Sequence, residues 1–220
     1  MSVLVVDGDS PDGTAAIVRQ KALTYGNVRL LSEPEKSGIG AAYMLGFSYA
    51  KDTMRADVII EFDADFQHPP ETIPMLLAKA MEGYDYVLGS RMIRGGGQTS
   101  GRSRFRTMLS KWGGLLARFI LFFPSRYFHE VTDPTTGLRL TRVKGCLDQL
   151  DLDPAHLYSR KFGYKVQLLA ETLMVGAHYA EIPLAFGDRA GGRSKIEVGT
   201  ALEILLACLQ TRIRGVRGGA

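Results

Sequence analysis

Two aspartates separated by one small residue are the strongest chemical signal in the sequence. Asp63 and Asp65 follow the apolar run Val58–Phe62, which predicts a strand, and Gln67 stands two residues further on. Carboxylates this close together repel one another unless a cation lies between them. Hard cations such as Mg²⁺ and Mn²⁺ take oxygen ligands, commonly one or two carboxylates together with substrate phosphates. The pattern favours such a cation site, to which Gln67 adds an amide oxygen, over solvated aspartates in a strand-end turn.

A second acidic loop follows the first apolar run of the chain. Asp7 and Asp9 come directly after Ser2–Val6, and Asp12 can cap the helix that starts beyond it. A calcium loop counted from Asp7 fails, because Pro11 stands where the fifth position needs an oxygen ligand. Two interpretations remain: carboxylates that bond to a nucleotide base or ribose, or simple turn and capping chemistry. The glycines at positions 38 and 40 do not continue into G-x-G-x-x-G, so a dinucleotide site is not supported.

A basic stretch that contains no acidic residue runs from Tyr86 to His129. It indicates either an anionic partner or a solvated basic face. No nucleic-acid-binding module and no set of stacked aromatics among the arginines is recognisable, so no nucleic-acid partner is expected. The basic residues are Arg91, Arg94, Arg102, Arg104, Arg106, Lys111, Arg118 and Arg126.

Short apolar runs alternate with helical patterns in the first half of the chain. This alternation predicts βαβ units and an α/β fold with a mostly parallel sheet flanked by helices. Ligands of such sheets bind beyond the carboxyl ends of the strands, where Asp7 and Asp63 stand. Strands are expected at Ser2–Val6, Val28–Leu31, Val58–Phe62 and Tyr86–Gly89, with helices after Asp12, over Gly40–Lys51 and from Pro70.

The second half opens with a loop rich in glycine, serine and arginine, Gly95 to about Arg104. A helix with an apolar face reaching Phe123 should follow it, and Val166–Val175 also has a helical pattern. His178–Phe186 is typical of a strand, and Ala201–Arg214 of an amphipathic helix. We expect one catalytic domain over residues 1–214 and a flexible tail over residues 215–220.

The composition is that of a globular chain of 220 residues with a net charge of +4. Its two cysteines, Cys146 and Cys208, each lie in an apolar stretch, which indicates packed thiols in a reducing compartment and no disulfide or zinc site. Neither a membrane-spanning run nor a signal peptide is recognisable. The expected location is cytoplasmic.

Several separate motifs resemble the dolichol-phosphate (polyprenol-phosphate) mannosyltransferases, within the family 2 glycosyltransferases of the GT-A fold. The resemblance covers nearly the whole chain, and the motifs occur in the family's order. The matching stretches are Val5–Thr14, Gly38–Gly46, Phe62–Glu71, Gly89–Arg91, Arg106–Lys111, Asp133–Arg142, Glu181–Pro183 and Asp188–Lys195.

The resemblance implies a Rossmann-like GT-A sheet, a divalent cation (Mg²⁺ or Mn²⁺), and inverting transfer of mannose from GDP-mannose to a polyprenyl phosphate. An acceptor that is already anionic needs no strong general base, and arginines can clamp its phosphate. The implied cation ligands are Asp63, Asp65 and Gln67; the sugar-nucleotide contacts are Asp7, Asp9, Asp63, Ala64, Asp65, Arg189 and Lys195; the acceptor-phosphate contacts are Arg91, Arg106 and Ser194; and the catalytic residues are Asp65, Arg91 and Asp133. Glu181 is interpreted as structural.

This sequence departs from the family at its start. Family members usually begin with one more strand and a P-x-Y-N-E loop, so we expect a sheet that lacks its usual first, central strand. The second carboxylate of the family's aspartate pair is displaced to Asp9. Two alternatives therefore stay open: UDP-glucose as the donor, or a truncated inactive member that acts as a partner subunit.

A lipid acceptor also requires contact with a membrane. Met108–Phe123 and Ala201–Arg214 combine apolar stripes with basic residues, as interfacial helices do, although core-facing helices share this pattern. We expect a peripheral protein on the cytoplasmic face of the membrane, with a membrane-anchored partner subunit as a further expectation.

Overall fold

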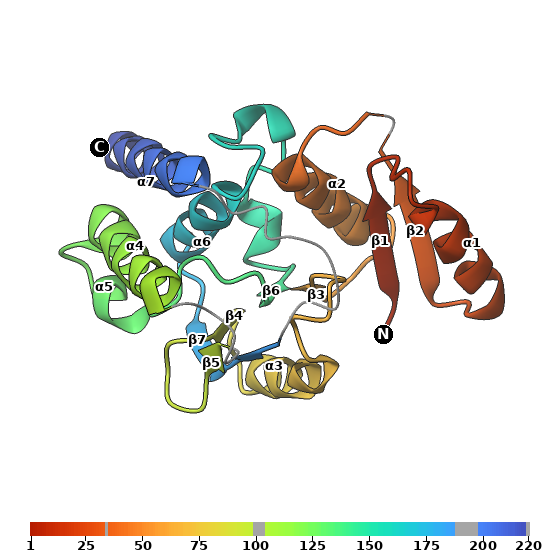
Figure 1. Ribbon diagram of the computed structural model, residues 1–220, viewed down its shortest axis with the longest axis horizontal. Coiled ribbons are helices and arrows are strands. Elements are labelled where there is room, and N and C mark those ends of the chain that lie inside the picture. The colour runs from red at the N-terminus through yellow and green to blue at the C-terminus, as the bar shows by residue number, and fades with distance from the viewer. Residues whose placement is uncertain (34, 99–103, 188–197, 219–220) are drawn as a thin grey trace.

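Parallel strands and the helices that cover them dominate the computed structural model (Figure 1). It describes residues 1–33, 35–98, 104–187 and 198–218. Within these residues, β1 (Val3–Asp7) and β2 (Val28–Ser32) form a parallel pair in which Asp7 lies opposite Ser32. Both strands form from short runs that are rich in valine and leucine.

A four-stranded sheet forms the centre of the molecule, in the order β3-β6-β4-β7. Its strands are β3 (Val58–Glu61), β6 (Arg139–Arg142), β4 (Tyr86–Ser90) and β7 (Tyr179–Pro183). The strands β4 and β7 are parallel, whereas β6 is antiparallel to both of its neighbours. Two short strands, β5 (Gly97–Gln98) and β8 (Ala185–Phe186), add a parallel ribbon.

Helices cover both faces of the four-stranded sheet, and β4 shows why. Its residues are all buried, and they alternate between two apolar clusters: Val87 packs with Leu76 of one helix, while Tyr86 and Leu88 pack with Leu169 of another. The helices are α1 (Thr14–Thr24), α2 (Ile39–Asp52), α3 (Ile73–Met81), α4 (Arg104–Phe122), α5 (Tyr127–Glu130), α6 (Tyr164–Met174) and α7 (Val198–Gly218). Short 3₁₀ turns lie at Pro70–Thr72, Leu147–Gln149 and Pro154–His156.

Most expected elements are confirmed, including the α/β class and all four strands expected in the first half. The antiparallel strand β6 was not predicted, because its sequence, Arg-Leu-Thr-Arg, carries a charge at each end. Both cysteines are buried free thiols, as expected. The helix α7 continues through Gly218, past the boundary expected at residue 214, and residues 219–220 lie outside the described part of the chain.

The sheet is divided. Within the described residues, β1 pairs only with β2, and β3 pairs only with β6, so no backbone ladder joins the two sheets. The consequence for the site is that Asp7 and Asp63 stand at the carboxyl ends of strands in two separate sheets.

Candidate active site

The two-aspartate loop begins where β3 ends and folds back on itself. The Asp65 carboxylate accepts a hydrogen bond from the backbone N–H of Gln67 (3.1 Å), which closes a tight turn. Phe66, at the tip of this turn, takes the left-handed conformation with φ of 64°. The turn folds Asp65 and Gln67 back directly after Asp63, where β3 has just ended.

Asp63 is held by Tyr43 of α2 and by His68 of its own loop. The Tyr43 hydroxyl donates to its Oδ1 (3.2 Å), and its own backbone N–H donates to His68 Nδ1 (3.1 Å). This bond leaves the proton of a neutral His68 on Nε2, 3.8 Å from Asp63 Oδ2. Burial lowers the pKa of His68, so the ring is neutral near pH 7. His68 is therefore a support for Asp63 and not a cation ligand.

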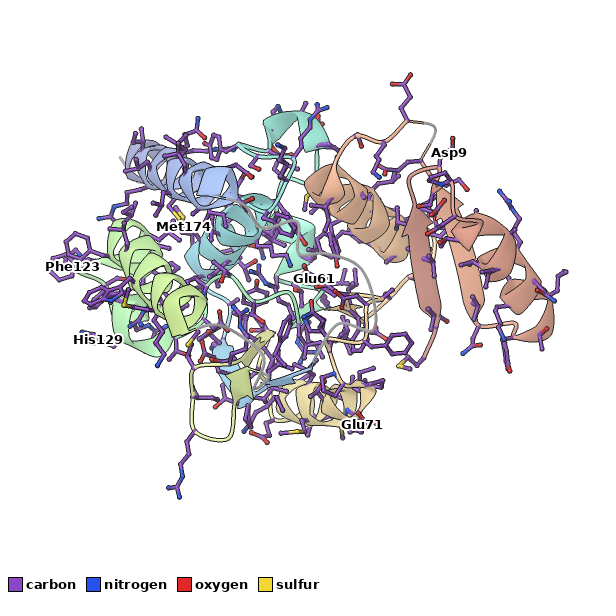
Figure 2. All side chains as sticks on the ribbon, viewed as in Figure 1. Asp9, Glu61, Glu71, Phe123, His129 and Met174 are labelled. Atoms are coloured by element: carbon purple, nitrogen blue, oxygen red, sulfur yellow. The ribbon has the colours of Figure 1, made fainter. Side chains whose placement is uncertain are left out.

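Two buried cations and a second carboxylate lie beneath this loop. Glu61, the last residue of β3, is in the interior of the molecule, as Figure 2 shows, and accepts from the Tyr164 hydroxyl (3.3 Å). Burial raises the pKa of Glu61 despite the nearby Arg139 and Lys165. Burial likewise lowers the pKa of Lys165, and Asp63 acts against this shift. The sequence analysis missed these residues, since charged residues within apolar elements carry no local signal of what they face.

A second acidic side chain binds an arginine at the end of β4. Arg91 donates through Nε (2.6 Å) and Nη2 (2.7 Å) to the two oxygens of Asp133, and its backbone N–H donates to the same carboxylate (3.1 Å). Thr135 accepts a further bond from Nη2 (3.2 Å). Because both side chains are largely buried, this bidentate pair fixes the direction of the guanidinium.

Glu181 of β7 holds the backbone of the segment that carries Asp133. The Glu181 carboxylate accepts from the backbone N–H of Thr132 (2.7 Å) and from that of Asp133 (3.4 Å), and also from the Tyr179 hydroxyl. On the other side, the fully buried Arg139 donates to the carbonyls of Pro134 and Thr136. Glu181 was interpreted as structural, and these contacts give it the task of shaping the Asp133 loop.

Phe186 and Gly187 join the two groups into one site. The Phe186 ring lies between the His68 ring (5.5 Å between centroids) and the Arg91 guanidinium (5.4 Å to the ring centroid). Gly187 donates its backbone N–H to the Gln67 carbonyl (2.8 Å), and the Gln67 side-chain amide donates to the Gly187 carbonyl (3.4 Å). The two-aspartate loop and the Arg91–Asp133 pair are thus neighbours.

The first acidic loop forms a separate group at the end of β1. Asp7 is almost fully buried, and its carboxylate accepts from the backbone N–H of Ser10 (3.1 Å). Asp9 is exposed, and Asp12 caps the first turn of α1 by accepting from Thr14, as expected. A carboxylate that the sequence analysis missed, Glu33, lies beside Gly8 and accepts from the Ser37 hydroxyl (2.6 Å).

The other expected site residues are less completely placed. Ala64 is exposed in the two-aspartate loop. Arg106 belongs to α4, where the structure describes its backbone alone. Arg189, Ser194 and Lys195 lie outside the described residues, although the segment that carries them starts directly after Gly187.

The oxygens of the two-aspartate loop fit a hard divalent cation. Two carboxylates and an amide oxygen are the ligand types that Mg²⁺ and Mn²⁺ prefer. In the described part of the chain, no group of three or more histidine, cysteine, aspartate or glutamate side chains is arranged to hold a metal. A cation here would therefore complete its shell with oxygens from a substrate or from water.

The sequence matches a known protein family and several characterised relatives. The profile of glycosyl transferase family 2 matches residues 1–145. An undecaprenyl-phosphate mannosyltransferase of Micrococcus luteus is 35% identical over 93% of this chain and 79% of its own length. A polyprenol monophosphomannose synthase of Mycolicibacterium smegmatis is 32% identical over 97% of this chain and 77% of its own length. A dolichol-phosphate mannosyltransferase of Pyrococcus furiosus is also 32% identical, but 92% of this chain spans only 53% of that protein.

Solved structures show the same fold at low identity. Glucosyl-3-phosphoglycerate synthase of Mycobacterium tuberculosis, in complex with Mn²⁺, UDP and phosphoglyceric acid, matches with a TM-score of 0.64 at 19% identity, over 96% of this chain and 67% of that one. The Pyrobaculum calidifontis mannosyltransferase PcManGT, in complex with GDP-Man and Mn²⁺, matches with a TM-score of 0.50 at 16% identity, over 99% and 65%. These matches confirm the GT-A type α/β fold, and both neighbours hold a divalent cation.

Proposed function

Because this chain belongs to glycosyl transferase family 2, we propose that it transfers mannose from GDP-mannose to a dolichyl or polyprenyl phosphate, with inversion and with a divalent cation. The names of all three sequence relatives support mannose as the sugar and a lipid phosphate as the acceptor. Two of the relatives align over more than three quarters of their own length, so the resemblance is not confined to one part of the chain.

One observation carries the proposal. A pair of carboxylates suited to a cation lies beside a guanidinium suited to a phosphate, and Phe186 contacts both His68, which supports Asp63, and Arg91. Transfer from a nucleoside diphosphate to a phosphate monoester brings two anionic groups together. A site for this reaction must therefore supply positive charge at two adjacent places.

Each residue has a role in this proposal. Asp63, Asp65 and Gln67 would hold the cation, which when bound offsets the charge that develops on the leaving diphosphate. Arg189 and Lys195 contact the diphosphate, while Arg106 and Ser194 bind the acceptor phosphate with Arg91. Asp133 aims Arg91, so it acts on the acceptor through that side chain. Asp7 and Asp9 contact the nucleoside at the end of β1.

The inverting step needs no strong base from the protein. The attacking oxygen belongs to a phosphate that is already ionised at neutral pH, so no proton has to be removed from it. The remaining task is to hold the acceptor in line with the sugar. Nη1 of Arg91 is the guanidinium nitrogen that does not bond Asp133, and it can donate to the acceptor phosphate.

Mass analysis of the lipid products tests the proposal. The protein is incubated with Mn²⁺, a polyprenyl phosphate and either GDP-mannose or UDP-glucose. The expected product is the mannosyl lipid, formed from GDP-mannose alone. A glucosyl lipid would assign the UDP-glucose alternative. No product, together with no metal-dependent thermal stabilisation by GDP or UDP, would favour an inactive partner subunit.

The Arg91 assignment gives a first prediction. Arg91→Lys keeps the positive charge but loses the paired bonds to Asp133, so the lysine ammonium is no longer directed toward the acceptor phosphate. We expect kcat/KM for the acceptor to fall about 100-fold, while GDP binding changes little. Steady-state kinetics with varied acceptor, and GDP titrations, measure the two effects. Arg94→Lys, at an exposed arginine nearby, is the matched control. Equal losses for donor and acceptor would contradict the assignment.

A surface formed by α4 and α7 supports contact with a membrane. The two helices lie side by side (Figure 1). Both place apolar side chains in solvent. Figure 2 shows Phe123 at the outer side of this pair. No helix in the described part of the chain is long and apolar enough to cross a bilayer. The exposed apolar residues are Met108, Trp112, Leu115, Leu116, Phe119 and Phe123 on and after α4, and Leu202, Leu206, Leu209 and Ile213 on α7.

The position of these side chains favours an interfacial role over a core-facing one. Trp112 is 64% exposed and Leu202 is 60% exposed, whereas Ala117 and Cys208, on the same two helices, are buried. Lys111 is exposed on α4 as well. Apolar side chains next to basic ones are the composition that binds anionic lipid surfaces.

Vesicle sedimentation gives a second prediction. We expect the protein to sediment with phosphatidylglycerol vesicles at low salt, and the double variant Trp112→Ser/Phe119→Ser to lose most of this binding. Leu23→Ser removes an even more exposed apolar residue from α1 and should bind like the unaltered protein. Binding to pure lipid would show that no membrane-anchored partner subunit is required. A protein that stays in the supernatant contradicts the membrane proposal.

A further inference from the structure

A buried lysine faces the two-aspartate loop from inside the molecule. Lys165 lies in the first turn of α6 and is 6% exposed. Its Nζ is 2.7 Å from the point where a Cβ on Gly137 would stand, and Asp63 Oδ2 is 2.9 Å from the same point. The absence of a side chain at Gly137 thus leaves a small space that the Lys165 amine, the Asp63 carboxylate and the His68 ring (Cε1 at 3.1 Å) all border.

The charged side chains around Lys165 interact mainly in two pairs, Glu61 with Arg139 and Asp63 with Lys165. Glu61 accepts from the Tyr164 hydroxyl and is influenced most strongly, among the nearby charges, by Arg139. Among the charged groups around Lys165, Asp63 has the largest effect on the pKa of the lysine, which it raises against the effect of burial. Asp63 Oδ2 therefore has Lys165 as its basic neighbour across the space at Gly137, and the Tyr43 hydroxyl donates to the other carboxylate oxygen.

We propose that Lys165 is a positioning residue that makes cation binding at Asp63 and Asp65 depend on the donor diphosphate. This inference rests on the cation site of the proposed function. The ammonium orients Asp63, and it also repels a divalent ion at close range. Repulsion between charges in a buried region is weakly screened by salt. A nucleoside diphosphate brings the negative charge that offsets this repulsion, so the cation binds together with the donor and only weakly alone.

Direct measurement of Mn²⁺ binding tests this role without any turnover. The electron paramagnetic resonance signal of free Mn²⁺ is followed at one neutral pH, with and without GDP. The unaltered protein should bind Mn²⁺ at least tenfold more tightly with GDP. Lys165→Met removes the charge at similar side-chain length, and we expect it to tighten binding of Mn²⁺ alone by about tenfold. The dependence on GDP should shrink accordingly.

Two variants separate the charge from the packing. Lys165→Arg keeps the positive charge and should restore the dependence on GDP. Thr172→Val, at a fully buried residue further along α6 whose hydroxyl has no partner within the described residues, should bind Mn²⁺ like the unaltered protein. If Lys165→Met does not fold, Lys165→Gln replaces it, with circular dichroism to verify the fold.

Each outcome has a distinct meaning. Unchanged or weaker binding of Mn²⁺ alone by a folded neutral variant overturns the role of Lys165. Tight binding of Mn²⁺ by the unaltered protein without GDP also overturns it, even if neither neutral variant folds. If the unaltered protein binds no Mn²⁺ in the presence of GDP or UDP, the cation site of the proposed function is itself contradicted, and the role of Lys165 falls with it.

Discussion

Asp65→Asn is expected to lower kcat/KM about a thousandfold or more while leaving the fold intact. The substitution removes one of the two carboxylates proposed to hold the cation, and with it the proposed stabilisation of the leaving diphosphate. The fold should persist because an asparagine side-chain oxygen can still accept the bond from the Gln67 backbone N–H that closes the turn. Product formation from GDP-mannose measures the activity, and thermal unfolding verifies the fold.

The control for this variant is an aspartate on the surface. Asp52→Asn, at the end of α2, changes the same charge at an exposed position and should keep full activity. Mn²⁺-dependent binding of GDP should be lost in Asp65→Asn and kept in Asp52→Asn. An Asp65→Asn protein with full activity would show that this carboxylate does not hold the cation.

Gly137→Ala is expected to lower kcat/KM about 100-fold, although it adds a single methyl group. The new Cβ would come within 2.7 Å of Lys165 Nζ, 2.9 Å of Asp63 Oδ2 and 3.1 Å of His68 Cε1. The lysine can swing away, but the short aspartate side chain moves only by turning out of its place beside the cation. A displacement of about 1 Å at a catalytic group is enough for a loss of this size.

A second glycine gives the matched control for the added methyl group. Gly113→Ala lies on α4, where a Cβ would meet no atom within 4 Å, and alanine is the better helix former. It should keep its activity and gain slightly in melting temperature. Activity of Gly137→Ala within twofold of the unaltered protein would show that Asp63 does not depend on this space.

The sequence predicts the parts of the site that local pattern controls. A strand followed by Asp63 and Asp65 is visible because apolar runs and turn residues act over a few positions, and the structure confirms both the strand and the turn. The same holds for Asp7 at the end of β1 and for the cap at Asp12. These features need no knowledge of distant segments.

Pairings across the chain are what the sequence alone does not disclose. Arg91 and Asp133 both belong to matched motifs, yet nothing local indicates that they bind each other over a separation of 42 residues. Lys165 sits in a helical pattern where a lysine usually faces solvent. Its burial follows from Gly137 and Asp63, which reach it only once β6 has been inserted between β3 and β4.

The amphipathic helix at the end of the chain illustrates another limit. Its apolar stripe was visible in the sequence, but the pattern fits a core-facing helix and an interfacial helix equally well. In the structure, smaller residues such as Ala207 and Cys208 pack inward, and leucines such as Leu202 and Leu206 face solvent. Periodicity identifies the apolar stripe of α7, but which residues are buried depends on how α7 packs against its neighbouring helices.

The divided sheet has a consequence for local stability. Every residue of β4 is buried, whereas β1 buries Asp7 alone and α1 buries none of its residues. Segments with few buried contacts open at a lower free energy than the global unfolding of the protein. The end of the molecule that carries Asp7 and Asp9 will therefore open locally more readily than the four-stranded sheet. In the proposed function, a nucleoside that binds at this end must also order it, so its affinity will be lower than the contacts alone would give.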